Sequence, residues 1–77
     1  ELPYVQLARE SMGIYPSVKD VVLARGATVS ADSLYAAPCL SVVVHRDSVF
    51  TPAEMSQLSE WLRVRLATDM EVVILQR

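Results

Sequence analysis

Three short runs of the chain are apolar at nearly every position: residues 21–23, 40–44 and 72–75. Successive side chains of a strand point to opposite faces, so a sheet with one face in water shows alternating apolar and polar residues. These runs barely alternate, which predicts a sheet with apolar side chains on both faces. A chain of 77 residues has too few elements to cover both. We therefore expect a twin subunit, another domain or a membrane to cover the second face.

The first part of the chain predicts a helix over residues 2–12. Pro3 suits the first helical turn, where its missing N–H costs nothing. An apolar stripe with helical spacing follows, formed by Tyr4, Val5, Ala8 and Met12, with Leu7 and Ser11 beside it. Gly13 is expected to end this helix. A turn is predicted at residues 15–17, because the residue before Pro16 is disfavoured in the α region.

The middle of the chain predicts two strands. The first covers Val18 to Ala24 and continues to Val29 if the polar residues 30–33 form a turn. The second covers Cys39 to His45. If the first strand instead stops at Gly26, a loop of 12 residues separates the two. We favour the long antiparallel hairpin, because long loops without structure are uncommon in small domains.

The clearest local signal starts a second helix at residue 51. Thr51 is an N-cap, Pro52 occupies the first helical position, and Glu54 completes a capping box. Phe50 and Met55 are placed to form a hydrophobic staple. The predicted buried stripe consists of Met55, Leu58, Leu62 and Leu66, flanked by Trp61. Residues 67–69 end the helix, and residues 71–76 form the last strand.

The element order α-β-β-α-β predicts an α+β fold, a two-layer ferredoxin-like sandwich with a three-stranded sheet and two helices on one face. Residues 1–77 form a single domain. The connection through the second helix is right-handed if the last strand lies parallel to the strand before it. The other face of the sheet is the predicted interface, with Val22, Val43, Val73 and Leu75 as its residues.

Composition strengthens the expectation of association. Hydrophobic residues make up 52% of the chain, above the usual 45–50%, and the mean hydropathy is +0.29. The net charge of −2 gives no electrostatic reason to bind nucleic acid. No apolar stretch approaches the roughly 18–20 residues that span a bilayer, so direct membrane insertion by this segment is not expected. The chain opens with Glu1 and not with Met, which indicates a piece of a longer protein or a processed terminus.

Residues that could carry chemistry are few. His45, the single histidine, lies two positions before Asp47, and the two form a candidate metal pair. The alternative is an exposed histidine at a strand end. One histidine and two glycines leave no oriented nucleophile and no phosphate loop, so we predict no catalytic residues, no enzyme and no cofactor. Cys39 is expected to be a small buried hydrophobe.

Two resemblances extend these expectations. The element order, with Tyr15-Pro16-Ser17-Val18 before the first strand and a helix starting Thr51-Pro52-Ala53-Glu54, is similar to the cytoplasmic domain of cation-diffusion-facilitator transporters. That resemblance implies a small ferredoxin-like module that dimerises and binds metal through histidines, of which His45 is the one counterpart. The segment 60–66, followed by residues 72–75, resembles the soluble C-terminal tails of bacterial hydrophobic membrane proteins. It implies a cytoplasmic domain tethered to the inner membrane through the rest of its protein.

These observations predict a non-catalytic oligomerisation or regulatory module of a larger protein, with a bacterial membrane protein as one candidate. The module would act through its apolar sheet face, and its partner would be a second copy or another domain of the parent protein. The alternative is a ligand- or metal-sensing domain whose site is shared across a dimer.

Overall fold

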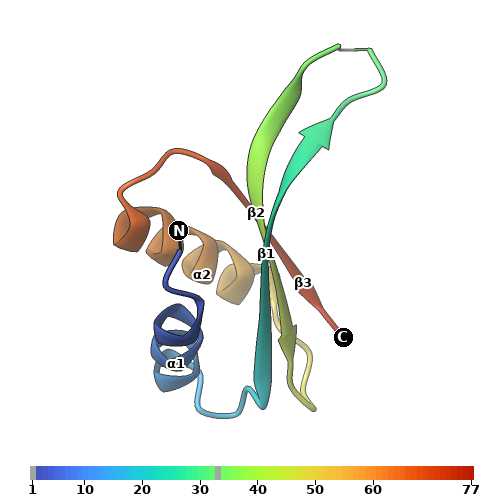
Figure 1. Ribbon diagram of the computed structural model, residues 1–77. Helices are drawn as coiled ribbons and strands as arrows, with labels where there is room; N and C mark the ends of the chain where they lie inside the picture. The colour runs from blue at the N-terminus through green and yellow to red at the C-terminus, as the bar shows by residue number, and fades with distance from the viewer. Residues whose placement is uncertain (1, 33) are drawn as a thin grey trace.

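The computed structural model describes residues 2–32 and 34–77. Its elements are α1 (Tyr4–Ile14), β1 (Asp20–Val29), β2 (Ala36–His45), α2 (Pro52–Leu66) and β3 (Glu71–Gln76). β2 is the central strand, antiparallel to β1 and parallel to β3. Both helices lie on one side of the sheet, which gives two layers (Figure 1). The predicted α+β sandwich with three strands and two helices on one face is therefore confirmed.

The hydrophobic core lies between the helices and one face of the sheet. Its fully buried side chains come from every part of that layer: Leu7 of α1, Leu40, Val42 and Val44 of β2, Phe50, and Leu58 and Leu62 of α2. Burying one such large side chain contributes about 1.5–3 kcal/mol. The core therefore depends on alternate residues of β2, which all point toward the helices.

The first helix differs from its prediction in both end and face. It runs to Ile14, so Gly13 lies inside it, and it ends before Pro16. Tyr15 has φ −122° and ψ 82°, as expected for a residue before proline. Leu7 and Ser11 are the buried residues of this helix, whereas the predicted Val5 is exposed. Ser11 can be buried because its hydroxyl donates to the carbonyl of Leu7 at 2.8 Å.

The predicted long hairpin is confirmed. β1 and β2 pair without a break from Asp20 opposite His45 to Val29 opposite Ala36. Ser33, in the predicted turn at residues 30–33, lies outside the described residues. β2 begins at Ala36, earlier than predicted. Pro38 is tolerated because β3 pairs with β2 only from Cys39 onward, so no strand on that side needs its missing N–H.

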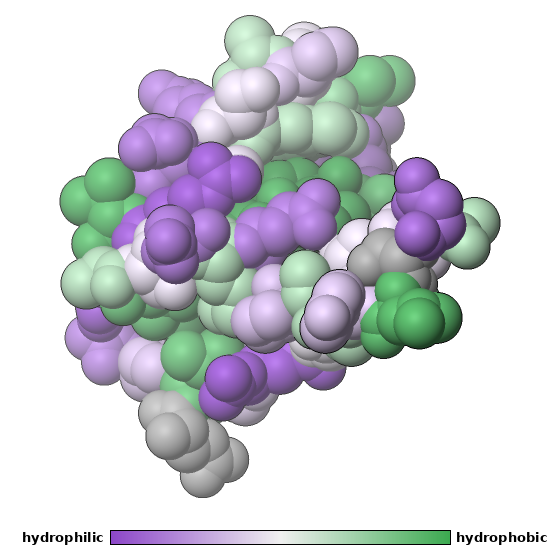
Figure 2. Space-filling model, turned by 90° about the horizontal axis from the view of Figure 1, so that it is seen from above, coloured by the Kyte–Doolittle hydropathy of each residue, from purple (hydrophilic) through white to green (hydrophobic). Residues whose placement is uncertain are grey.

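The distal part of the hairpin extends beyond the rest of the molecule. We call residues 26–32 and 34–38 the hairpin arm; it is two-stranded and projects past both helices (Figure 1). Leu34 is 100% exposed and Tyr35 is 84% exposed. Figure 2 shows the molecule from above, and on this side apolar residues lie at the surface between polar ones.

The predicted capping box of α2 is present. The Oγ1 atom of Thr51 accepts a hydrogen bond from the Glu54 amide at 3.1 Å, and Oε1 of Glu54 accepts one from the Thr51 amide at 3.0 Å. Arg46, which follows β2, donates to the same carboxylate at 2.8 Å and lies 4.4 Å from the centre of the Phe50 ring. Arg46, together with the Thr51 amide, lowers the pKa of Glu54 to about 2. The start of α2 is thus fixed to the end of the central strand.

Candidate functional site

The face of the sheet away from the helices is the candidate site. Val22 lies opposite Val43, which lies beside Leu75, so all three point to one side, and Val73 points the same way. By this register the open face consists of Asp20, Val22, Ala24, Gly26 and Thr28 of β1, Ala37, Cys39, Ser41, Val43 and His45 of β2, Glu71, Val73 and Leu75 of β3, and Arg77. No helix or strand in the described ranges covers it (Figure 1).

The four residues predicted from the sequence form the apolar centre of the open face. Val22 is 44% exposed and Leu75 is 53% exposed, while Val43 and Val73 are half-buried. On the same strands, Val42 and Val72 point to the helices and are buried. The absence of alternation in the sequence therefore corresponds to two apolar faces, of which one is covered within the chain.

Two polar bridges bracket this apolar centre. Toward the hairpin arm, the hydroxyl of Thr28 donates to Oε1 of Glu71 at 2.9 Å. At the other end, the guanidinium of Arg77 donates to Oδ1 of Asp20 at 2.7 Å. Each bridge joins the two outer strands, so it crosses above β2. Cys39, on the open face near the Thr28–Glu71 bridge, is buried.

The candidate metal residues have separate partners. The Nδ1 atom of His45 lies 3.2 Å from Oδ2 of Asp20, whereas Oδ1 of Asp47 accepts a hydrogen bond from Nζ of Lys19 at 2.9 Å. The contact with His45, and then the one with Arg77, lower the pKa of Asp20, and Lys19 lowers the pKa of Asp47. The part of the chain that the structure describes contains no group of three metal-ligating side chains. His45 and Asp47 are near each other, and each already forms a polar contact of its own.

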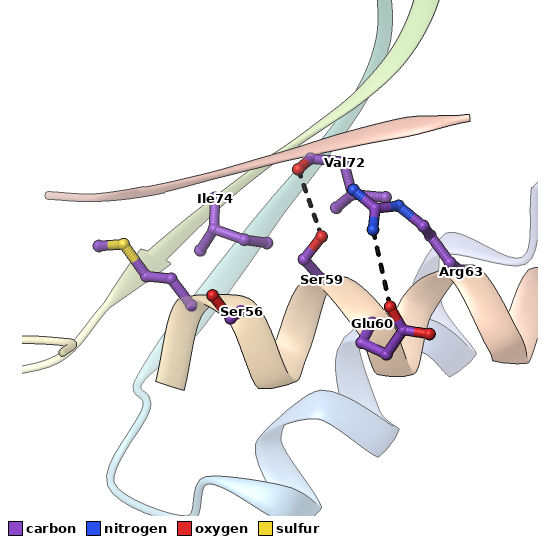
Figure 3. A pocket seen from close by; sticks show the side chains of 7 residues that line it. Ser56, Ser59, Glu60, Arg63, Val72 and Ile74 are labelled. Atoms are coloured by element: carbon purple, nitrogen blue, oxygen red, sulfur yellow. Dashed lines mark hydrogen bonds and ion pairs between the residues drawn. The ribbon is translucent and has the colours of Figure 1, made fainter. Parts of the chain in front are cut away.

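A groove of about 340 Å³ lies between α2 and the outer edge of β3 (Figure 3). The Ser59 hydroxyl donates to the carbonyl of Val72 at 3.5 Å, and Nε of Arg63 donates to the carbonyl of Met70 at 3.3 Å. Arg63 also lies 3.7 Å from Glu60. Two polar side chains of the groove, Ser59 and Arg63, therefore bind the backbone at and just before the start of β3. His45, the one histidine of the chain, points to the opposite face of the sheet, so no serine of this groove can pair with it.

The four residues of the polar bridges were not among the site residues predicted from the sequence. Strand alternation, which identified the apolar centre, also places Asp20, Glu71 and Arg77 on the open face. Each lies two positions from a residue of that centre: Val22, Val73 or Leu75. Thr28 lies six positions from Val22 in β1, an even number, so it also points to the open face. What the sequence did not contain was the register between β2 and β3, which decides that Glu71 and Thr28 meet.

The chain belongs to the family described as Domain of unknown function (DUF8492), which matches residues 3–77. Comparisons with curated proteins and with solved structures found no match. Neither helix in the described ranges has the length and apolar character needed to cross a membrane. The family description gives no activity, so the open face is the feature from which a function can be inferred.

Proposed function

We propose that this member of the DUF8492 family is a non-catalytic association module whose open face is covered by a second copy of the same chain. The supporting observation is the row formed by Val22, Val43 and Leu75 across all three strands, with Val22 and Leu75 about half exposed. Apolar area of this kind drives association when it is removed from water.

A second copy is favoured as the occupant because the charges of the open face have both signs and lie at its two ends. Glu71 is at the end toward the hairpin arm and has no ion pair among the described residues. Arg77 and His45 are at the other end, where one carboxylate, Asp20, serves both. A surface with an unpaired carboxylate at one end and an exposed guanidinium at the other is complementary to a second copy of itself turned end for end.

Self-association tests the proposal. Sedimentation equilibrium of the wild-type chain should show a dimer at micromolar concentration. Val43→Lys places a charge at the centre of the open face and should give a monomer with an unchanged circular dichroism spectrum. Val64→Lys is the matched control, because Val64 is an exposed valine on α2, and this variant should dimerise like wild type.

A wild-type chain that stays monomeric up to millimolar concentration would refute the proposal. If Val43→Lys does not fold, Leu75→Thr serves instead, because Leu75 is at an exposed position of an outer strand. Dimerisation of Leu75→Thr with wild-type affinity would refute the open face as the contact surface.

A further inference from the structure

The open face carries a row of large side chains beside a row of small ones. Val22, Val43 and Leu75 form the large row. Two residues closer to the hairpin arm, each strand carries a smaller side chain than the one it gives to the large row, and these residues, Ala24, Ser41 and Val73, form the small row. Tight packing of two sheets requires large side chains to face small ones, so a flat copy of the same surface fits best when each large row meets a small row.

The charged ends lie symmetrically about the line between these rows. Glu71 and Arg77 are six residues apart along β3, which is about 20 Å in a strand. The midpoint between them is at Ile74, which pairs with Val42. The same midpoint separates the large row from the small row. A single two-fold axis at this level therefore satisfies both the packing and the charges.

We infer that two copies pack open face to open face with their strands antiparallel, about a two-fold axis that passes over Val42 and Ile74. This inference rests on the proposed function and specifies its geometry. The large row of each copy lies on the small row of the other, with Val43 over Ser41 and Leu75 over Val73. At each end, Glu71 of one copy meets Arg77 of the other.

The opposite orientation satisfies the same surface less well. With strands parallel, the large row would face itself, and Val43 would meet Val43. Arg77 of one copy would then lie over Asp20 of the other, the same kind of residue that it already pairs with in its own chain. Glu71 would lie near Gly26 of the other copy, with no cation to neutralise it. Large side chains against large ones hold the sheets apart, and an uncompensated carboxylate would be buried, at a cost in free energy.

A charge-exchange experiment decides between the orientations. Glu71→Arg and Arg77→Glu are prepared separately, and dimerisation of each alone and of their equimolar mixture is measured by sedimentation velocity. In the antiparallel dimer each variant alone brings like charges together at both ends, so its affinity should fall roughly tenfold. In the mixed dimer, the two substituted side chains meet at one end with opposite charges, and the native Glu71–Arg77 pair forms at the other. The mixture should therefore regain nearly wild-type affinity.

The control pair is Glu60→Arg and Arg63→Glu, which exchanges charges on α2, on the other side of the sheet. These variants should dimerise like wild type, alone and mixed. Wild-type affinity of Glu71→Arg alone, or a mixture that associates no better than its components, would overturn the antiparallel geometry while the proposed function stands. Absence of any wild-type dimer would overturn both.

A second measurement avoids dependence on charge. In a Cys39→Ser background, Glu71→Cys is mixed with Arg77→Cys and treated with a short bis-maleimide. The antiparallel geometry predicts a cross-link in the mixture and none in Glu71→Cys alone, whose two thiols would be about 20 Å apart. A cross-linked dimer of Glu71→Cys alone, at the yield of the mixture, would contradict it.

Discussion

The two faces of the sheet are built from the same kinds of residue, and they differ in what covers them. On the helix side, Val42 and Val44 are buried under α1 and α2. On the open side, Val43 and Val22 have similar side chains and remain partly exposed. The buried helix-side residues of β2 are all apolar, whereas a polar bridge lies at each end of the apolar centre of the open side. The first face therefore forms the core, and the second is the face that we propose to pack against a second copy.

The largest expected effect is on the helix side of the sheet. Leu62→Ala removes a fully buried side chain of α2 and should lower the free energy of unfolding by about 2–5 kcal/mol, because it leaves a cavity. Urea denaturation measures the change. Val64→Ala on the exposed side of α2 is the control and should stay within about 0.5 kcal/mol of wild type. A loss below about 1 kcal/mol for Leu62→Ala would mean that α2 does not cover the core as described.

Two neighbouring residues of β2 test the comparison directly. Val42→Thr puts a hydroxyl into the core without a partner and should cost about 1–3 kcal/mol. Val43→Thr places the same group on the open face, and its cost should be within about 0.5 kcal/mol. Both are measured by urea denaturation at a protein concentration low enough to keep the chain monomeric. Equal losses for the two variants would remove the distinction between the faces.

A smaller effect concerns the start of the helix that covers the core. Thr51→Ala removes the side-chain acceptor for the Glu54 amide and should cost about 1 kcal/mol. Thermal or urea unfolding checks this value. Thr28→Ala is a suitable control, since Thr28 is also exposed and hydrogen-bonded to a glutamate but caps no helix. A Thr51→Ala protein as stable as wild type would show that the cap does not hold α2 in place.

The smallest effect is an acid dependence of the same cap. The pKa of Glu54 is about 2 in the folded chain and 4.5 ordinarily, so its ionised form stabilises the fold above about pH 4.5. This stabilisation is lost as the pH falls toward 2. Urea midpoints measured from about pH 5 to about pH 2 should therefore fall more steeply for wild type than for Glu54→Gln. Parallel curves for the two proteins would contradict the role of the carboxylate.

Local signals in the sequence predicted all five elements, although not all of their boundaries, but they did not predict which side chains of different strands meet. The capping box at Thr51 depends on residues within four positions, and it was predicted correctly. Alternation along a strand is enough to assign side chains to a face. The common face of the four predicted interface residues could therefore also be predicted: Val22, Val43, Val73 and Leu75. The polar bridges could not, because the distance between Thr28 and Glu71 depends on how three strands are aligned. The same limit applies to Gln76, whose side chain donates to the carbonyls of Arg46 and Ser48 and holds the loop after β2.

The hairpin arm has a consequence for how the molecule opens. Its amides bond only between two strands, which project past both helices, whereas from Cys39 onward β2 lies between two neighbours and above a core (Figure 1). Local opening free energies follow such differences in packing. Amide hydrogen exchange should therefore be fastest near Val29 and slow progressively toward Val42. The chain can lose the pairing of its arm, and expose those strand edges to solvent or to proteases, while its helices and core remain intact.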